Sequence, residues 1–272
     1  MTKGEIVRLI NQVYIPYGLE IEMESVKYEE GERLFRHFLD DAWIIGDDQT
    51  LDNRGLELTS PVLSNEGSTY ILLKKISKTI KHLGATFKHA SFQINFSIDD
   101  MNDEDIINLL KAYSIFENVV YRFSRGDYFT LRENIFVHAG PIGNLFSHEY
   151  SLHNDLFSKY KSFINSKQYG LSLKTLTRND YDPIKVVEFR TPSSSNSYDI
   201  WINYLLFFSS LLTYVKGGQY EKDYIDYMFD RRDIINDVDK LLEIDGNKAK
   251  KLANSIFKDG AAREQFYNQY FK

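Results

Sequence analysis

Two residues of opposite charge stand two positions apart in a segment that is typical of a β-strand. Residues 186–192 read V-V-E-F-R-T-P, and the valines and the phenylalanine favour a strand. Side chains two positions apart project from the same face of a strand, so we expect Glu188 and Arg190 to lie side by side. A carboxylate is a hard ligand for a divalent cation, and a guanidinium binds phosphoryl oxygens. The pair could therefore hold a metal ion next to a phosphoryl group.

The same pair also fits a surface ion pair on a sheet with one solvated face, which contributes little to stability. The interpretation as a site requires further acidic residues on neighbouring strands. Residues 17–26 read Y-G-L-E-I-E-M-E-S-V, and strict alternation places Glu20, Glu22 and Glu24 on one face. Such carboxylates repel one another and raise one another's pKa values, which a divalent cation relieves. The alternative is a solvent-facing acidic strand.

Two more alternating segments carry polar side chains on one face. Residues 55–60, G-L-E-L-T-S, place Glu57 opposite two leucines, and Pro61 ends that strand. Residues 90–98, A-S-F-Q-I-N-F-S-I, place Gln93, Asn95 and Ser97 opposite four apolar residues. If all these strands belong to one sheet, its polar face is an acidic funnel with an arginine at one end.

The remaining elements must position these strands. A short strand is predicted at 42–45, followed by a loop, and two strands at 171–177 and 185–190 surround the turn N-D-Y-D-P. Apolar periodicity predicts helices. Their ranges are 5–13, 29–39, 66–83, 103–116, 149–165 and 200–215, with a polar helical tail from 221 that breaks near 245–247 and 259–260.

Composition narrows the functional classes. The 272 residues carry a net charge of −6, which argues against general affinity for nucleic acid, and no cysteine, which excludes disulfides and zinc–sulfur sites. The N-terminus is too polar for a signal peptide, and the apolar run at 200–215 is too short to span a bilayer. We therefore expect a cytoplasmic protein with no membrane partner. The histidines at 138, 148 and 153 lack metal-site spacing and are predicted to be surface or loop residues.

Several motifs follow one another along the chain. They are Y-G-L-E-I-E, D-D-Q-T-L, G-L-E-L-T-S-P-V-L, a strand in the place of an H-x-H-x-S segment, and V-E-F-R with an N-x-Y and an apolar helix. In this order, the motifs resemble the amidoligase family, which is similar to the wider carboxylate–amine ligases, glutamine synthetase and glutamate–cysteine ligase. The resemblance covers roughly residues 17–215. It implies an α+β fold with a curved, mostly antiparallel sheet, helices on its outer face and a helical C-terminal tail. The implied division is a catalytic domain at 1–218 and a helical extension at 219–272.

The resemblance also implies ATP-dependent formation of an amide bond, in which a carboxylate attacks the γ-phosphoryl group and an amine then displaces phosphate from the acyl phosphate. The implied cofactors are ATP and Mg²⁺ or Mn²⁺. The implied substrates are a small-molecule or peptide carboxylate and an amine. The sequence leaves open whether the protein forms a homo-oligomer.

The resemblance assigns roles to individual residues. The implied metal ligands are Glu20, Glu22, Asp48, Glu57 and Glu188. Arg190 stabilises the γ-phosphate, Glu57 is a candidate to accept the proton of the amine, and Arg125 in F-S-R-G-D-Y binds phosphate or a substrate carboxylate.

One departure from the family pattern concerns the H-x-H-x-S strand, which here reads Q-I-N-F-S. Gln93 and Asn95 replace the two histidines, so Gln93, Asn95 and Ser97 become the implied nucleotide- and metal-facing residues. An amide oxygen can still coordinate Mg²⁺. The replacement also leaves open a non-catalytic binding or regulatory protein, and a phosphotransferase on the same scaffold is a third alternative.

Overall fold

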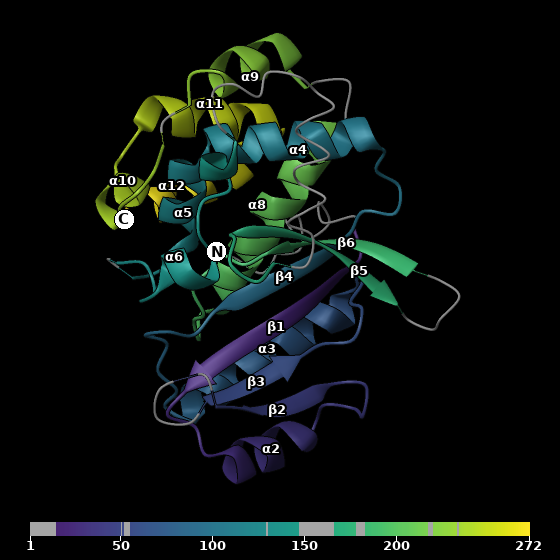
Figure 1. Cartoon of the computed structure of the whole chain (residues 1–272). Helices are drawn as coiled ribbons and strands as arrows, with labels where there is room; N and C mark the ends of the chain where they lie inside the picture. The colour runs from purple at the N-terminus through teal and green to yellow at the C-terminus, as the bar shows by residue number, and fades with distance from the viewer. Residues whose placement is uncertain are drawn as a thin grey trace.

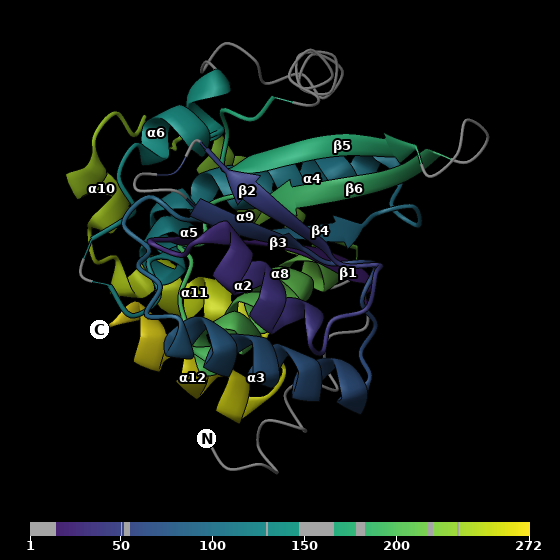
Figure 2. The ribbon, with the colours of Figure 1, turned by 90° about the horizontal axis from the view of Figure 1, so that it is seen from below.

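The structure of the protein is a computed structural model that describes residues 15–49, 51, 55–128, 130–146, 166–177, 183–216, 220–232 and 234–272. The predicted helices at 5–13 and 149–165, and the histidines at 148 and 153, lie outside these residues. In the described part, a six-stranded sheet has helices packed against one face (Figures 1 and 2). The predicted α+β class is confirmed.

The sheet is antiparallel at every described pairing, with strand order β2-β3-β1-β4-β6-β5. The strands are β1 (Tyr17–Glu24), β2 (Ile44–Asp48), β3 (Gly55–Thr59), β4 (Phe92–Ser97), β5 (Leu171–Thr177) and β6 (Pro183–Phe189). The strands predicted from alternation at 17–26, 55–60 and 90–98 are confirmed, as are the two strands around the N-D-Y-D-P turn.

The helices mostly follow the predicted periodicity. Those before the last two strands are α2 (Tyr28–Arg36), α3 (Gly67–His82), α4 (Asp103–Ile115), α5 (Glu117–Ser124), α6 (Ile135–His138) and the short 3₁₀ helix η1 (Gly143–Leu145). Those after them are α8 (Tyr198–Lys216), α9 (Lys222–Phe229), α10 (Val238–Leu242), α11 (Gly246–Ile256) and α12 (Gly260–Tyr270).

The apolar face of the sheet is covered by α8. The ring of Phe92 on β4 stacks on Trp201 at 5.3 Å, and the ring of Phe189 on β6 stacks on Phe208 at 4.2 Å between centroids. These four side chains are completely buried, so their packing contributes the hydrophobic and aromatic stabilisation of a well-filled core. Figure 2 shows α3 and α8 on the same side of the sheet. The opposite face is left to the polar side chains.

Local signals set several helix ends. Asn102 caps α4 by accepting from the amide of Asp105, and the side chain of Asp105 accepts from the amide of Asn102 in return. Gly84, with φ of +67°, follows the last turn of α3, a left-handed conformation that glycine adopts without strain. Both predicted breaks in the tail are present, between α10 and α11 and between α11 and α12.

The edge strand β2 differs from its prediction. The expected strand ended at residue 45, because the following glycine and aspartates have low β propensity. The observed strand continues to Asp48, since β2 pairs with β3 as far as the pair Asp48–Gly55. Pairing with the neighbouring strand therefore outweighs local propensity here, and it moves Asp48 from a loop onto the sheet.

The C-terminal helices lie on the helical layer. α11 and α12 contact α8, and the guanidinium Nε of Arg122 on α5 donates to the carbonyl of Tyr270 at 2.9 Å. The division into domains at residue 218 stays a prediction. In the described part of the chain, no helix is long and apolar enough to cross a membrane.

Candidate functional site

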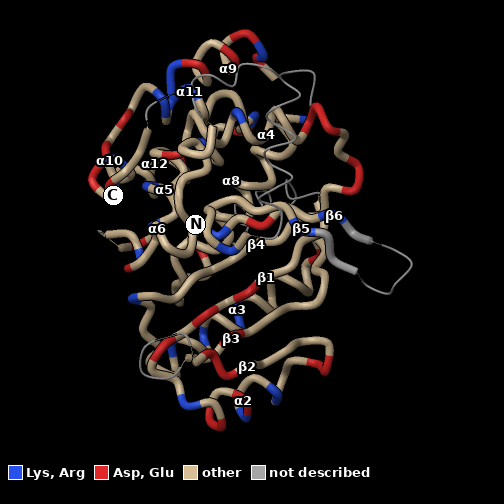
Figure 3. Tube along the Cα trace, in the orientation of Figure 1, with Lys and Arg blue, Asp and Glu red and all other residues tan. Residues whose placement is uncertain are grey.

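The polar side chains predicted on separate strands share one face of the sheet. Register pairs Glu22 with Glu57 across β1 and β3, and Glu20 with Gln93 across β1 and β4. Asn95 in turn opposes Glu188 across β4 and β6. Directly opposed residues in antiparallel strands point to the same side. The predicted acidic face is therefore confirmed, and red segments recur along β1 and β2 in Figure 3.

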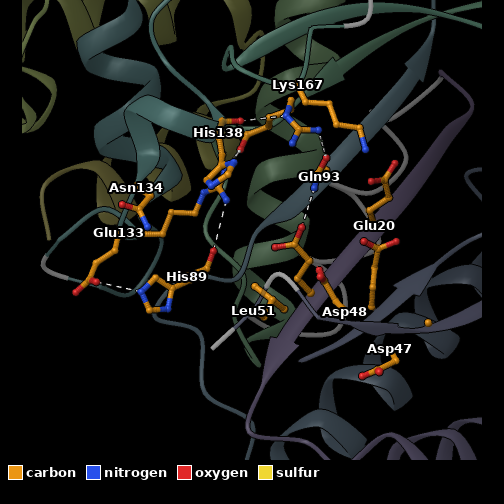
Figure 4. Close-up of a pocket in the computed structure, with 15 residues that line it drawn as sticks. Glu20, Asp47, Asp48, Leu51, His89, Gln93, Glu133, Asn134, His138 and Lys167 are labelled. Carbon is orange, nitrogen blue, oxygen red and sulfur yellow. Dashed lines mark hydrogen bonds and ion pairs between the residues drawn. The ribbon is translucent and has the colours of Figure 1, made fainter. Parts of the chain in front are cut away.

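A cavity of about 770 Å³, the main cavity, opens on this face (Figure 4). Its lining residues are Glu20, Glu22, Gly46, Asp47, Asp48, Leu51, Glu57, His89, Gln93, Arg132, Glu133, Asn134, His138, Lys167 and Arg190. Carboxylates from β1, β2 and β3 lie on one side, and cationic side chains lie on the other. In Figure 4, Glu20 and Asp48 face the cavity from the sheet, while His138 and Lys167 approach it from the opposite side.

Three carboxylates of the main cavity are close enough to share a cation. One oxygen from each of Glu22, Asp48 and Glu57 lies within 4.8 Å of the other two. Asp48 joins the group because β2 extends along β3. Oxygen donors of this kind suit Mg²⁺, which also keeps several waters when it binds proteins. The donor set therefore fits the metal implied by the sequence.

Two of the three ligands are already oriented. Glu22 accepts from the amide of Ser91 at 2.6 Å and from Nε2 of Gln93 at 2.9 Å. Glu57 accepts from the hydroxyl of Thr59 at 2.8 Å. Each carboxylate oxygen has two lone pairs, so these bonds leave room for a metal ion. Hydrogen bonds of this type orient the ligands of a metal site.

In the absence of a cation, burial and repulsion between carboxylates raise the pKa values of two of the acidic residues in the main cavity, Glu57 and Glu20. Burial, followed by the charges of Glu20, Glu22 and Asp48, raises the pKa of Glu57, although Thr59 opposes the shift. Burial and then the charge of Glu188 raise the pKa of Glu20. Both shifts disfavour the charged form, and a bound divalent cation would reverse them.

The cationic side contains a buried arginine that the sequence analysis missed. Arg132 is 7% exposed, and its Nη2 donates to the carbonyl of Arg190 at 3.0 Å. Its Nε has no hydrogen-bond partner among the described residues. Burial lowers the pKa of Arg132 to about 10, with Glu22 opposing the shift and Arg190 adding to it, so the guanidinium stays charged at neutral pH. Arg132 lines the main cavity, and a charged guanidinium there suits a bound anion.

Arg190 is held in place by Glu188, which was predicted beside it, and by Gln93 and the carbonyl of His138. Its Nη1 donates to Gln93 at 2.5 Å and to Glu188 at 3.0 Å, and its Nε donates to the carbonyl of His138 at 3.2 Å. Gln93 thus links Arg190 to Glu22, and its oxygen is engaged by the guanidinium. Among the described residues, Nη2 of Arg190 has no protein partner and remains available to a ligand in the cavity.

Both carboxylate oxygens of Glu188 are already paired with protein cations, unlike those of a ligand that is free to bind a metal ion. Its side chain is completely buried, and its two oxygens form ion pairs with Lys174 and Arg190. The predicted role of Glu188 as a metal ligand stays a prediction, and it requires Lys174 to release one oxygen. What the structure does provide is a fixed anion that orients Arg190.

Asn95 and Ser97 line a second cavity of about 450 Å³, the side cavity, together with Lys174 and Asp99. Glu20 lines both cavities, and it accepts from Nδ2 of Asn95 at 3.1 Å. The two cavities therefore meet at Glu20. A ligand in one cavity would contact the same carboxylate as a ligand in the other.

Arg125, predicted to bind phosphate or substrate, lines neither cavity. It caps the C-terminal end of α5 and is 3% exposed. Burial lowers its pKa, and the charge of Arg122 adds to this effect. Arg132, seven residues further along, lies beside Arg190 and lines the main cavity instead.

Two histidines reach the main cavity. His138 ends α6 and is exposed, as predicted, but it lies at the cavity beside Arg190. Partial desolvation and then the charges of Arg132 and Arg190 lower its pKa, which favours a neutral ring at neutral pH. His89 is held between Glu24 and Glu133, at 2.8 and 3.0 Å. No spacing in the sequence marks either residue.

Comparisons with known proteins do not identify a family. No family model matches the sequence, and no curated protein matches it. Among solved structures, a bifunctional glutathione synthetase from Pasteurella multocida is similar, with a TM-score of 0.48 and 10% sequence identity. That match covers 99% of this chain and 49% of the other, so the chain spans about half the length of that enzyme. A likeness of this extent assigns neither a fold family nor an activity.

Proposed function

We propose that the protein is an ATP- and Mg²⁺-dependent carboxylate–amine ligase of the amidoligase type. The observation that carries the proposal is the main cavity, in which three convergent carboxylates face two buried guanidiniums. A polyphosphate needs this combination, because a divalent cation and arginines together neutralise its charge. The order of the motifs along the chain supports the same reading.

The residues present fit both cofactors. Glu22, Asp48 and Glu57 would hold Mg²⁺ with oxygen donors, and the guanidinium groups of Arg132 and Arg190 would bind phosphate oxygens. When bound, ATP supplies the phosphoryl group that activates a carboxylate. A cavity of about 770 Å³ lies within the usual size of cofactor sites.

Two side chains of the protein would accept the proton of the amine and orient the substrates. Glu57, which lines the main cavity, would accept a proton from the incoming amine. Glu20 would separate the two cavities and orient a substrate in each. The acid would be an amino acid or a peptide carboxylate, as the motif resemblance suggests.

The proposal is tested by ADP release. The purified protein is incubated with ATP, Mg²⁺ or Mn²⁺ and pairs of amino acids, and the products are identified by mass spectrometry. We expect ADP release that requires metal, acid and amine together, with an amide product that has lost one water relative to its two substrates. A stable phosphorylated product without an amine requirement would instead indicate a phosphotransferase.

Metal binding gives a direct prediction. Replacing Glu57 by glutamine removes one of the three converging charges while preserving an acceptor for Thr59. We expect the affinity for Mn²⁺, measured by isothermal titration calorimetry, to fall at least about tenfold. The matched control is Asp47→Asn, which removes a charge from the same cavity outside the triad and should change the affinity by less than about threefold. Equal losses in the two variants would show only a general electrostatic effect.

A second candidate is a binding or regulatory protein that keeps the fold without catalysis. It is favoured by the hydrogen bonds that Glu188 and Gln93 already accept. Lys174 and Arg190 donate to the two oxygens of Glu188, and Arg190 also donates to the oxygen of Gln93. Such a protein would bind nucleotide or an anion in the main cavity and release no ADP with any substrate pair. Nucleotide binding without turnover favours this candidate, and no nucleotide binding at all contradicts the ligase.

A further inference from the structure

Lys174 on β5 occupies an unusual position for a lysine, because it neutralises a carboxylate inside the protein. Its ammonium forms an ion pair with Oε1 of Glu188, whose side chain is 0% exposed, while Lys174 itself is 16% exposed. Arg190 takes the other oxygen of Glu188 at 3.0 Å. Buried carboxylates persist only when their charge is paired. Here two protein cations complete that pairing.

The atoms around this ion pair are oxygen donors. In register, Glu188 is directly opposed by Asn95 on β4 and by Ser172 on β5. Oδ1 of Asn95 and the hydroxyl of Ser172 are buried and have no hydrogen-bond partner among the described residues. Ser172 is 2% exposed, and Glu20 accepts from the other end of the Asn95 amide at 3.1 Å.

This arrangement has the composition of a cation site. Carboxylate, amide and hydroxyl oxygens are the ligands that hard divalent cations prefer. A buried acceptor without a partner costs free energy that a bound cation would recover. The ammonium of Lys174 is paired with Oε1 of Glu188, the carboxylate that would otherwise be the strongest ligand of this group.

We propose that the ammonium of Lys174 takes the place of a second divalent cation on the sheet face, beside Glu188, Asn95 and Ser172. The protein then binds one metal ion, in the triad of the main cavity, and supplies the second positive charge itself. This inference rests on the proposed function, which supplies the metal ion in the triad and the reason why a second positive charge is needed. Lys174 also lines the side cavity, so a ligand that entered there would contact its side chain.

The test counts bound Mn²⁺ ions by electron paramagnetic resonance in the wild type and in Lys174→Met. Methionine has a similar length and carries no charge, so Glu188 gains a free oxygen. We expect one ion per chain in the wild type and two in Lys174→Met. The double variant Lys174→Met with Glu188→Gln should return to one. The matched control is Lys167→Met, which removes a lysine from the main cavity without touching Glu188 and should show no gain.

The increment between variant and wild type decides the inference, provided that the wild type does not already bind two ions. An unchanged count in a folded Lys174→Met protein overturns it, as does a second ion in the wild type. A wild type without bound metal contradicts the triad of the proposed function, and the gain of one ion in the variant would still support the role of Lys174. If Lys174→Met lacks a cooperative thermal transition, Lys174→Gln replaces it. The neutral N–H of glutamine can satisfy Glu188 during folding and is displaced more easily by a divalent cation than an ammonium is, so a gain of one ion is again expected.

Discussion

Replacing Arg190 by lysine is expected to lower ATP-dependent turnover by roughly 10²- to 10³-fold, the usual loss when one preorganised donor to developing charge is removed. The guanidinium uses Nη1 and Nε to bind Glu188, Gln93 and the carbonyl of His138, which leaves Nη2 for a ligand. Lysine has one nitrogen on a flexible stem and cannot form all these bonds while it reaches the cavity. Single-turnover measurements at saturating ATP check the chemical step.

Two controls separate the role of Arg190 from its contribution to folding. Lysine keeps a positive charge near the buried Glu188, which also retains Lys174, so the far-UV circular dichroism and a cooperative melt should be preserved. Arg33→Ala removes an exposed arginine from α2, outside both cavities, and should leave turnover unchanged. Wild-type turnover in a folded Arg190→Lys protein would remove Arg190 from the proposed site.

The second large effect concerns Glu117 on α5, which lies outside the proposed site. Its side chain is almost completely buried and accepts hydrogen bonds from the amides of Ile142 at 2.5 Å and Gly143 at 3.1 and 3.2 Å. Burial raises the pKa of Glu117 from 4.5 to about 8, although the two amides and the charge of Arg232 oppose the shift. Glu117 is therefore protonated in the folded protein at neutral pH.

This shift predicts how stability depends on pH. Below pH 4.5 the carboxyl is protonated in both states, and its contribution to stability is fully present. Between pH 4.5 and about 8 the unfolded chain releases a proton that the folded chain keeps, so the free energy of unfolding falls as pH rises. At about 1.4 kcal/mol per pH unit, the loss is on the order of 5 kcal/mol.

Glu117→Gln isolates this contribution, because glutamine preserves an acceptor for both amides and does not titrate. Urea unfolding at several pH values should show that the variant becomes more stable than the wild type as pH rises from 5 to 8, and that the two converge at low pH. The control Glu243→Gln changes an exposed glutamate that lines the same cavity as Glu117. Its stability should depend on pH as that of the wild type does. A constant difference between Glu117→Gln and wild type at all pH values would contradict a titrating Glu117.

The predicted faces of the strands agree with the structure because alternation is a local property. In β1 and β4, side chains two positions apart must share a face whatever the rest of the chain does. Glu20, Glu22, Gln93 and Asn95 therefore lie on the polar face as expected. Chain breaks at glycines are equally local, which explains why the breaks in the tail were predictable.

The composition of the cavity was less predictable, because loops and registers bring distant residues together. Asp48 joins Glu22 and Glu57 only through the continued pairing of β2 with β3. Arg132 enters the cavity because the chain after α5 returns over the sheet, where its Nη2 reaches the carbonyl of Arg190. Arg125 had the more suggestive motif, yet it is buried at the end of α5.

By itself, the sequence determined that several strands present carboxylates and amides on one face, and that Glu188 and Arg190 share that face. Both properties follow from the two-residue period of a strand. Only the tertiary structure decided which charges neighbour each other. Charge interactions depend on distance and burial, and the pairing of β5 with β6 brings Lys174 to Glu188. Glu188 and Arg190 thus form an ion-paired group of three with Lys174, beside a separate carboxylate triad.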